Sequence, residues 1–363
     1  MSAIDAPTGA AARGAPGRGI AGWLRGGRGA APPINLALQG GGAHGAFTWG
    51  VLEALLGDPR VRFEGISASS AGAMNAVVMA HGWMQGGRDG AREALADFWA
   101  AIGSQMPGAM VTQDRNDDFG LSAPTRWFAS LAGYFTPTQL NPLALNPLRD
   151  LIERQIDFER LRSASPFKLF IGATHADSGK LRLFREHELT ADMLLASACL
   201  PRIHHVVEVD GEAYWDGGYS ANPAIYPLFY DCEASDVLLV LLSPLEREAT
   251  PDSVDGIGTR IAELGFTAHF MREMSLFARA AEFARPSFLS VGRLERRLRR
   301  MRFHMIDTSE IATLHRTDTK MLAHAPFLEM LRLQGQARAG EWMVRHFDEV
   351  GRGSTVDVAR LFG

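Results

Sequence analysis

The chain has 363 residues, of which 46% are hydrophobic and 21% are charged, so it can bury a sizeable core in one large domain. Its net charge of -4 argues against a nucleic-acid-binding protein, which needs a basic surface. Two cysteines, Cys199 and Cys232, exclude a disulfide framework and lack the spacing of metal ligands. We therefore expect a protein of a reducing compartment such as the cytoplasm, with no metal and no other cofactor.

The longest apolar runs, such as residues 237–242, are far shorter than the roughly 18 residues expected of a membrane-spanning helix. Residues 1–33 are dominated by Gly, Ala, Pro and Arg, a composition that predicts a disordered tail. The arginines of this tail flank a small apolar cluster at residues 20–24, but without a sustained amphipathic face they favour a solvated tail over a lipid anchor. We expect no transmembrane segment, and any membrane contact should be peripheral.

The first predicted elements are a strand at residues 34–39, a glycine-rich loop with the sequence GGGAHG at residues 40–45, and a helix at residues 46–56. Backbone N–H groups at the start of a helix point outward without partners, and the helix dipole adds positive potential there. The loop is therefore suited to hold an anion.

Several kinds of site share such a loop. Gly40, Gly42 and Gly45 satisfy the G-x-G-x-x-G spacing of a dinucleotide site, but the acidic residue that should end the next strand is missing, and Glu64 within that strand is a poor substitute. A Walker loop would need Lys and then Ser or Thr after the last glycine, where this chain has Ala and Phe. An oxyanion hole needs only N–H donors beside a nucleophile, and a tight structural turn needs neither.

The following strand, predicted at residues 61–64, leads into the sequence ASSAG at residues 68–72, which precedes an apolar run that begins a helix. A serine among small residues between a strand and a helix is typical of a nucleophile elbow, with the pattern G-x-S-x-G. Gly72 matches the second glycine and so selects Ser70 over its neighbouring serine, whereas Ala68 replaces the first glycine. Ser70 is the candidate nucleophile, and its presence favours the oxyanion hole.

Residues 90–103 are predicted to be helical, but residues 104–146 are irregular and rich in proline and large apolar side chains. A loop of this length is usually functional or disordered, and its aromatic residues argue against disorder. We expect it either to cap an apolar substrate groove or to pack aromatic side chains such as Trp127, Phe128 and Phe135 into the core.

The next predicted elements alternate between helices and strands, as in an α/β sheet. They are a helix at residues 147–156, strands at 167–174 and 181–184, a helix at 191–199, a hairpin of strands at 206–209 and 212–215, and a buried strand at 236–242. Beyond about residue 252 the chain is predicted to be helical, apart from a short strand at residues 303–306.

The hairpin delivers the sequence Asp216-Gly217-Gly218 at the end of its second strand. A carboxylate at a strand end, freed from steric crowding by two glycines, is well placed to enter a cleft. Taken alone, Asp-Gly-Gly is more often a turn than a catalytic motif, since these residue types dominate turns.

Taken together, the loop, the elbow and this aspartate resemble the pattern of the patatin-like phospholipase family. The pattern runs G-G-G-x-[RK]-G, then G-x-S-x-G, then D-G-[GA], and the chain has all three in this order. The segment at residues 196–201 also resembles the helix that these proteins carry before the aspartate, and the similarity covers about residues 35–242.

This resemblance implies an α/β fold with three α/β/α layers and a central, mostly parallel sheet. It divides the chain into the tail at residues 1–33, a catalytic domain at residues 34–243, and a mainly helical C-terminal extension at residues 244–363 that packs on the catalytic domain.

The resemblance also implies a reaction, the hydrolysis of carboxylic esters of lipids by a Ser-Asp dyad without a cofactor. Ser70 would attack the ester, Asp216 would accept its proton, and the N–H groups of Gly40, Gly41 and Gly42 would bind the oxyanion. Supporting positions in the loop, the elbow and the turn would be His44, Gly45, Ala68, Gly72, Gly217 and Gly218.

Two residues depart from the family pattern. Ala68 adds one methyl group at the elbow, which we expect the fold to tolerate. His44 stands where the pattern has Arg or Lys, so a fixed positive charge beside the loop becomes titratable. If this charge assists the binding of anionic lipids, activity on them should fall at high pH.

An exposed aspartate is too weakly basic to activate a serine. We therefore expect desolvation beside the apolar strand of Trp215 to raise the pKa of Asp216. The alternative is a Ser-His-Asp triad with a histidine after the aspartate, although none of the candidates stands in a recognisable motif: His269, His304, His315, His324 and His346. The pair His204-His205 precedes the aspartate and is expected to flank the groove.

A further alternative is a lipid-binding or regulatory protein that keeps the fold without turnover, because a fold alone does not establish activity. The prediction that best accounts for all three motifs is a lipid acyl hydrolase whose partner is a lipid or another acyl ester.

Overall fold

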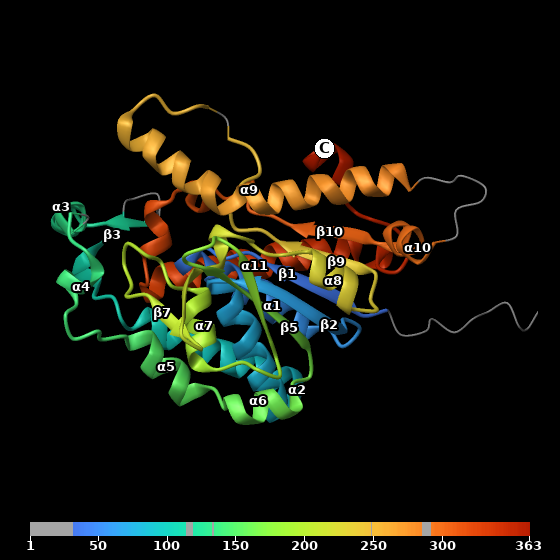
Figure 1. Ribbon diagram of the computed structural model, residues 1–363, viewed down its shortest axis with the longest axis horizontal. Coiled ribbons are helices and arrows are strands. Elements are labelled where there is room, and N and C mark those ends of the chain that lie inside the picture. Colours follow the sequence, from blue (N-terminus) through green and yellow to red (C-terminus); the bar gives the residue numbers. More distant parts are fainter. Residues whose placement is uncertain (1–31, 114–118, 133, 248, 285–291) are drawn as a thin grey trace, which may run out of the picture.

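The computed structural model describes residues 32–113, 119–132, 134–247, 249–284 and 292–363 (Figure 1). The tail predicted at residues 1–33 therefore lies almost entirely outside the described residues. Within them, the centre of the molecule is an eight-stranded sheet in the order β10-β9-β1-β2-β5-β8-β7, with β6 paired to β5. Its strands are β1 (Ile34–Leu38), β2 (Phe63–Ser69), β5 (Lys168–His175), β6 (Leu181–Arg185), β7 (Val207–Val209), β8 (Glu212–Asp216), β9 (Asp236–Val240) and β10 (Arg302–Ile306).

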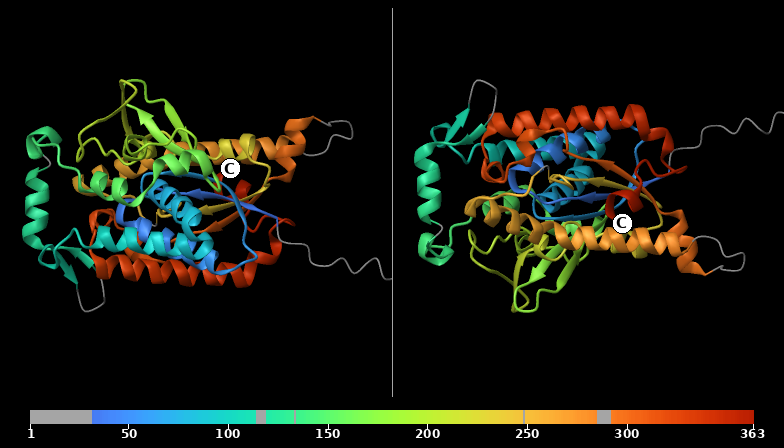
Figure 2. Two further views of the ribbon diagram at one scale, coloured as in Figure 1. Left: turned by 90° about the horizontal axis from the view of Figure 1, so that it is seen from below. Right: turned by 90° about the horizontal axis from the view of Figure 1, so that it is seen from above.

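The sheet is parallel through β10, β9, β1, β2 and β5, and antiparallel where β6, β7 and β8 join it. Helices cover both faces (Figure 2). One face carries α1 (Gly45–Gly57), α2 (Ala71–Gly103), α5 (Pro147–Gln155), α6 (Phe158–Ala164), α7 (Ala191–Ser197) and α11 (Ala325–His346), and the other carries α8 (Tyr226–Asp231), α9 (Val254–Phe283), α10 (Arg293–Arg300) and α12 (Val358–Phe362). The three-layer α/β/α fold expected from the sequence is thus confirmed.

Residue alternation along the strands builds the two cores. Leu36 of β1 and Leu238 of β9 are paired in register and belong to the core beneath α1 and α11. Their successors, Ala37 and Leu239, belong to the opposite core beneath α8 and α9. Because successive side chains of a strand point to opposite faces, a continuous apolar run such as that of β9 indicates a strand buried on both sides.

The region after residue 243 is helical apart from β10, as expected, but it is not a mere appendage. β10 pairs in parallel with β9 and so extends the sheet, while α11 packs along α1. The 3-10 helices within the described residues are η2 (Gly42–His44), η3 (Gly108–Met110), η4 (Gly217–Tyr219), η5 (Ala312–His315), η6 (Asp318–Met321) and η7 (Phe347–Glu349). The domain boundary at residue 243 remains a prediction.

The described residues of the segment 104–146 form an arm at one end of the molecule (Figure 1). Its elements are β3 (Val111–Gln113), β4 (Phe119–Leu121), α3 (Ala123–Ala132) and α4 (Pro137–Leu140). Phe119 is buried in the main core, but Trp127, Phe128 and Phe135 are exposed. The expectation that these three aromatic side chains pack into the core is therefore wrong.

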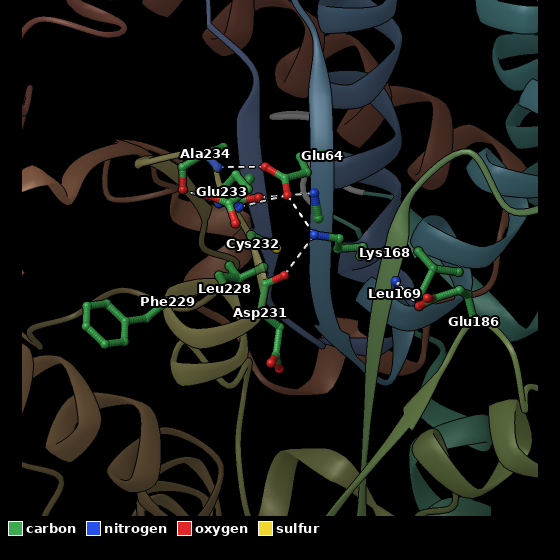
Figure 3. Close-up of polar contacts among 12 residues, drawn as sticks. Glu64, Lys168, Leu169, Glu186, Leu228, Phe229, Asp231, Cys232, Glu233 and Ala234 are labelled. Atoms are coloured by element: carbon green, nitrogen blue, oxygen red, sulfur yellow. Dashed lines mark hydrogen bonds and ion pairs between the residues drawn. The ribbon is translucent and has the colours of Figure 1, made fainter. Parts of the chain in front are cut away.

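A cluster of polar contacts surrounds Glu64 near the N-terminal ends of the parallel strands (Figure 3). The carboxylate of Glu64 accepts hydrogen bonds from Lys168 Nζ at 2.9 Å and from the backbone N–H groups of Glu233 at 2.8 Å and Ala234 at 2.6 Å. These contacts tie the start of β2 to the start of β5 and to the turn before β9. The carboxylate thus has a structural role at the edge of the sheet opposite to the glycine-rich loop, which removes the dinucleotide interpretation of that loop.

Candidate active site

Ser70 lies in the sharp turn between β2 and α2, with φ 54° and ψ -126°. Positive φ is uncommon for a residue other than glycine and marks the strained turn of a nucleophile elbow. The turn is held by the Ser70 N–H, which donates to Ser197 Oγ at 3.0 Å and to the Ser197 carbonyl at 3.1 Å. Ser69 is fully buried and donates its hydroxyl to the Ala221 carbonyl at 2.7 Å, so Ser70 is the serine left facing the cavity.

The glycine-rich loop follows β1 and packs directly on this turn. A Cβ atom at Gly40 would lie 2.7 Å from Ser70 Cβ, so only glycine allows the loop to approach the serine this closely. Gly42 has φ 59°, a left-handed conformation that also favours glycine. Among the described residues, the N–H groups of Gly41 and Gly42 have no hydrogen-bond partner, and both residues line the cavity.

The N–H group of Gly40 is not free. It donates to Asn222 Oδ1 at 2.7 Å, a contact between residues 182 positions apart. The expectation that Gly40 supplies a third donor to an oxyanion is therefore wrong, because its hydrogen is already bound. Asn222 instead anchors the loop, a role that the sequence did not reveal.

Asp216 ends β8 and is fully buried. Its Oδ1 accepts a hydrogen bond from the Gly218 N–H at 2.7 Å, whereas Oδ2 has no hydrogen bond of standard geometry with any described residue. Burial raises the pKa of Asp216 to about 6, against the opposing effects of the Gly218 N–H and of the nearby Ser70 hydroxyl. The carboxylate is thus a stronger base than an exposed aspartate, as expected.

The source of this burial differs from the expectation. The side chains of Trp215 and Asp216 alternate along β8, and that of Trp215 is exposed. Trp215 therefore does not desolvate the carboxylate. The turn that follows Asp216 is covered instead by Phe266 of α9, since a Cβ atom at Gly218 would lie 2.4 Å from the Phe266 ring.

His44 is fully buried and hydrogen-bonds to Thr319 Oγ1 through Nε2 at 2.8 Å. Burial, and secondarily the charge of Lys320, lower the pKa of His44 to about 3. His44 is therefore neutral across the pH range in which histidine usually titrates. The expectation that it places a titratable charge beside the loop is wrong.

The remaining supporting positions lie where the motifs place them. Gly72 is in the first turn of α2 against the backbone of Leu38, and Gly45 packs against Ala71 at the start of α1. Ala68 is buried in the main core, which accommodates its methyl group. The contacts made by these residues shape the backbone around Ser70.

A cavity of about 390 Å³ opens between these elements. Gly40, Gly41, Gly42, Ser70 and Asp216 all line it, so the structure brings together residues that are up to 176 positions apart. Most of the other lining side chains are apolar, and they include Met74, Phe98, Trp99, Ile102, Leu148 and Phe266. An elongated apolar group of a substrate would fit such a wall.

No described residue of the arm at residues 104–146 lines the cavity, although Ile102 and Leu148, on either side of the arm in sequence, do. The described part of the arm therefore stays outside the lining of the cavity and does not roof it. The sequence also missed the contribution of the C-terminal region, because Phe266, Lys320 and their neighbours lie in no recognisable motif.

The five histidines of the alternative triad do not line the cavity. His304 is instead buried on β10, where its Nε2 lies 3.1 Å from Asp236 Oδ1, and Asp236 also pairs with Arg302. His204 does line the cavity, as expected for a residue that flanks the groove, while His205 contacts the Asn141 carbonyl at 2.8 Å. No described histidine after Asp216 is placed to serve as the base.

The comparison with known proteins agrees with the three motifs. Residues 36–229 match the family described as patatin-like phospholipase, which is more than half of the chain. The chain belongs to the patatin-like phospholipase family. Family membership implies a lipid acyl hydrolase.

A solved structure, that of VipD from Legionella pneumophila, is similar to this patatin-like chain over 83% of its length and 67% of that chain, with 14% identity and a TM-score of 0.34. No curated protein matches the sequence. Among the described helices, none combines the length and the apolar character needed to cross a bilayer.

Proposed function

We propose that this protein hydrolyses carboxylic esters of lipids through a dyad of Ser70 and Asp216. The observation that carries the proposal is the placement of Ser70, on a strained turn and in the same apolar cavity as a fully buried carboxylate whose pKa is raised to about 6. A serine hydroxyl needs a base to become a nucleophile, and the base works best when its pKa lies near the working pH.

In the first half of the reaction, Asp216 accepts the Ser70 proton while Oγ attacks the carbonyl carbon of the ester. The unpaired Oδ2 of Asp216 is the atom available for this transfer. The tetrahedral oxyanion accepts hydrogen bonds from the N–H groups of Gly41 and Gly42, each of which contributes on the order of 3 kcal/mol to catalysis. The alcohol then leaves with the proton that Asp216 holds.

In the second half, Asp216 takes a proton from a water molecule, which attacks the acyl group on Ser70. The same two N–H groups bind the second oxyanion, and collapse of this intermediate releases the fatty acid and returns the proton to Ser70. Gly40 and Asn222 act by position, because their hydrogen bond fixes the loop against the elbow.

A fluorophosphonate probe and a fatty-acid release assay test this proposal. The wild-type protein should be labelled by the probe and should release fatty acid from long-chain phospholipid in mixed micelles, because both need an activated serine in an apolar cavity. Absence of labelling and of release, in a folded protein, would support the alternative of a lipid-binding protein without turnover.

We also propose that the protein meets its substrate at a membrane surface. Trp127 and Phe128 on α3 are 69% and 63% exposed, and the first half of α9, which contributes Phe266 to the cavity, exposes Ile257 and Ile261. Exposed aromatic side chains near the site would insert at the boundary between head groups and acyl chains.

The double variant Trp127→Ser/Phe128→Ser should bind phosphatidylcholine vesicles about 10-fold more weakly, since it removes two apolar side chains from the lipid boundary. Vesicle co-sedimentation measures this. Phe283→Ser is the matched control, because Phe283 is 95% exposed at the far end of α9. Equal loss of binding in the double variant and in the control would contradict a specific lipid-facing role for α3.

As for location, both cysteines are free and buried, and burial raises the pKa of Cys199 to about 11 and that of Cys232 to about 12. Such inert thiols fit the proposal of a cytoplasmic protein.

A further inference from the structure

The C-terminal region gives the cavity a polar side. This side is lined by Glu263 of α9, by Lys320 of η6 and Thr317 just before it, and by Ser243 in the segment after β9. Among the described residues that line the cavity, Lys320 is the one lysine or arginine. α2 supplies the large apolar side chains Met74, Phe98, Trp99 and Ile102 to the cavity, and Phe266 of α9 adds another.

Lys320 is fixed beside the glycine-rich loop. A Cβ atom at Gly42 would lie 2.4 Å from the Lys320 carbonyl oxygen and 3.7 Å from Lys320 Cβ. The neighbouring Thr319 hydrogen-bonds to His44 in the same loop at 2.8 Å. The Lys320 side chain therefore starts within a few ångströms of the N–H donors proposed for the oxyanion.

The ammonium group of Lys320 has no ion-pair partner among the described residues. Its Nζ reaches Ser243 Oγ at 3.5 Å, and no described carboxylate oxygen lies within 4.0 Å of it. The nearby Glu263 carboxylate is already engaged, because it pairs with Arg247 and Arg260 and accepts a hydrogen bond from Thr317 at 2.8 Å.

Burial lowers the pKa of Lys320; the charge of Glu263 acts in the opposite direction, and that of Arg247 in the same direction as burial. A partly buried cation without an ion-pair partner gains more from an incoming anion than a solvated one does. The environment of Lys320 thus favours a ligand with a negative charge.

We propose that Lys320 binds an anionic group of the substrate, the phosphodiester of a glycerophospholipid, and thereby selects phospholipids over neutral acylglycerols. In such a lipid the phosphate is only a few covalent bonds from the scissile ester. The backbone and Cβ of Lys320 pack on Gly42, and its Nζ lies 3.5 Å from Ser243 Oγ, which also lines the cavity. This inference rests on the proposed ester hydrolysis and adds the substrate class to it.

The test compares dioleoyl phosphatidylcholine with dioleoylglycerol in the same mixed micelles, so that the acyl chains are identical. Lys320→Met should lower the ratio of kcat/KM for the phospholipid to kcat/KM for the diacylglycerol by about 10- to 100-fold, the usual scale for losing a charge-assisted hydrogen bond. Lys320→Arg should keep part of the ratio, because it retains the charge. Lys180→Met is the matched control on an exposed turn and should leave the ratio unchanged.

An unchanged ratio in Lys320→Met would overturn the inference, as would a wild-type protein that hydrolyses the diacylglycerol alone. Thermal unfolding shows whether the variant is folded, and Lys320→Gln replaces it if it is not. Inhibition by oleate tests whether Lys320 binds the carboxylate of the fatty-acid product instead of the substrate phosphate. Relief of that inhibition in Lys320→Met, with an unchanged ratio, would assign Lys320 to the product carboxylate. If the wild-type protein hydrolyses neither lipid, the proposed function itself fails.

Discussion

Replacing Ser70 with alanine should abolish fluorophosphonate labelling and lower kcat/KM for ester hydrolysis by more than about 10³-fold, because loss of a nucleophile leaves only binding and oxyanion stabilisation. The structure supplies a close control in Ser69→Ala. Ser69 is adjacent in sequence, but it is fully buried and its hydroxyl donates to the Ala221 carbonyl. This control should keep the label, although it loses one buried hydrogen bond.

Variants of Asp216 and of the later histidines separate the two hydrolase mechanisms. In the dyad, Asp216→Asn should be as inactive as Ser70→Ala, while alanine variants of the five later histidines should keep the label. Loss of turnover in one histidine variant, with Asp216→Asn still active, would refute the dyad. Labelling that persists in Ser70→Ala and disappears in Ser69→Ala would show that the elbow serine was wrongly assigned.

The second large effect concerns pH. Because the pKa of Asp216 is about 6, kcat/KM for a soluble ester should rise roughly tenfold per pH unit between about pH 4.5 and 5.5. It should level off above about pH 7, where the base is ionised. A profile from pH 4.5 to 8.5 in a constant-ionic-strength buffer measures this. A midpoint near the ordinary aspartate pKa would show that Asp216 is not the group that controls the rate.

The same carboxylate should destabilise the folded protein at high pH. Its folded-state pKa lies above the unfolded value of 3.8, so the folded state binds the proton more tightly, and stability is lost as pH rises from that value through about 6. A rise from 3.8 to about 6 corresponds to a cost on the order of 3 kcal/mol for the ionised group.

Asp216→Asn removes this cost. At pH 8 the variant should therefore unfold at a higher denaturant concentration than the wild type, whereas at pH 4 the two should nearly coincide. Equilibrium urea unfolding at both pH values measures the difference. A variant that is inactive and less stable at pH 8 would mean that the ionised carboxylate stabilises the fold, contrary to the burial seen here.

The features that the sequence predicted well depend on short stretches of backbone. A strand, a glycine loop and a helix are specified by neighbouring residues, so β1, the loop and α1 were placed correctly. The second strand was predicted at residues 61–64, but β2 runs from Phe63 to Ser69, and the helix predicted at residues 90–103 is the second half of α2, which begins at Ala71 and is kinked at Gly86 and Gly87. Alternation of strands and helices likewise predicted the α/β sheet. The continuous apolar run of β9 agrees with it, since such a strand is buried on both faces. The proposed pairing of Ser70 and Asp216 came from the resemblance to the patatin-like phospholipase family and not from any geometry visible in the chain.

Burial, hydrogen bonding and charge were decided by residues far apart in sequence. Asn222 accepts a hydrogen bond from the Gly40 N–H, 182 positions away in sequence. Thr319 hydrogen-bonds to the buried His44 ring, 275 positions away. The sequence by itself determined the backbone of the elbow and the loop, since local residue types set those turns. Only the tertiary structure decided that His44 is neutral, that Gly40 is already bound and that Lys320 enters the cavity, because solvation and partners depend on the packing of the whole chain.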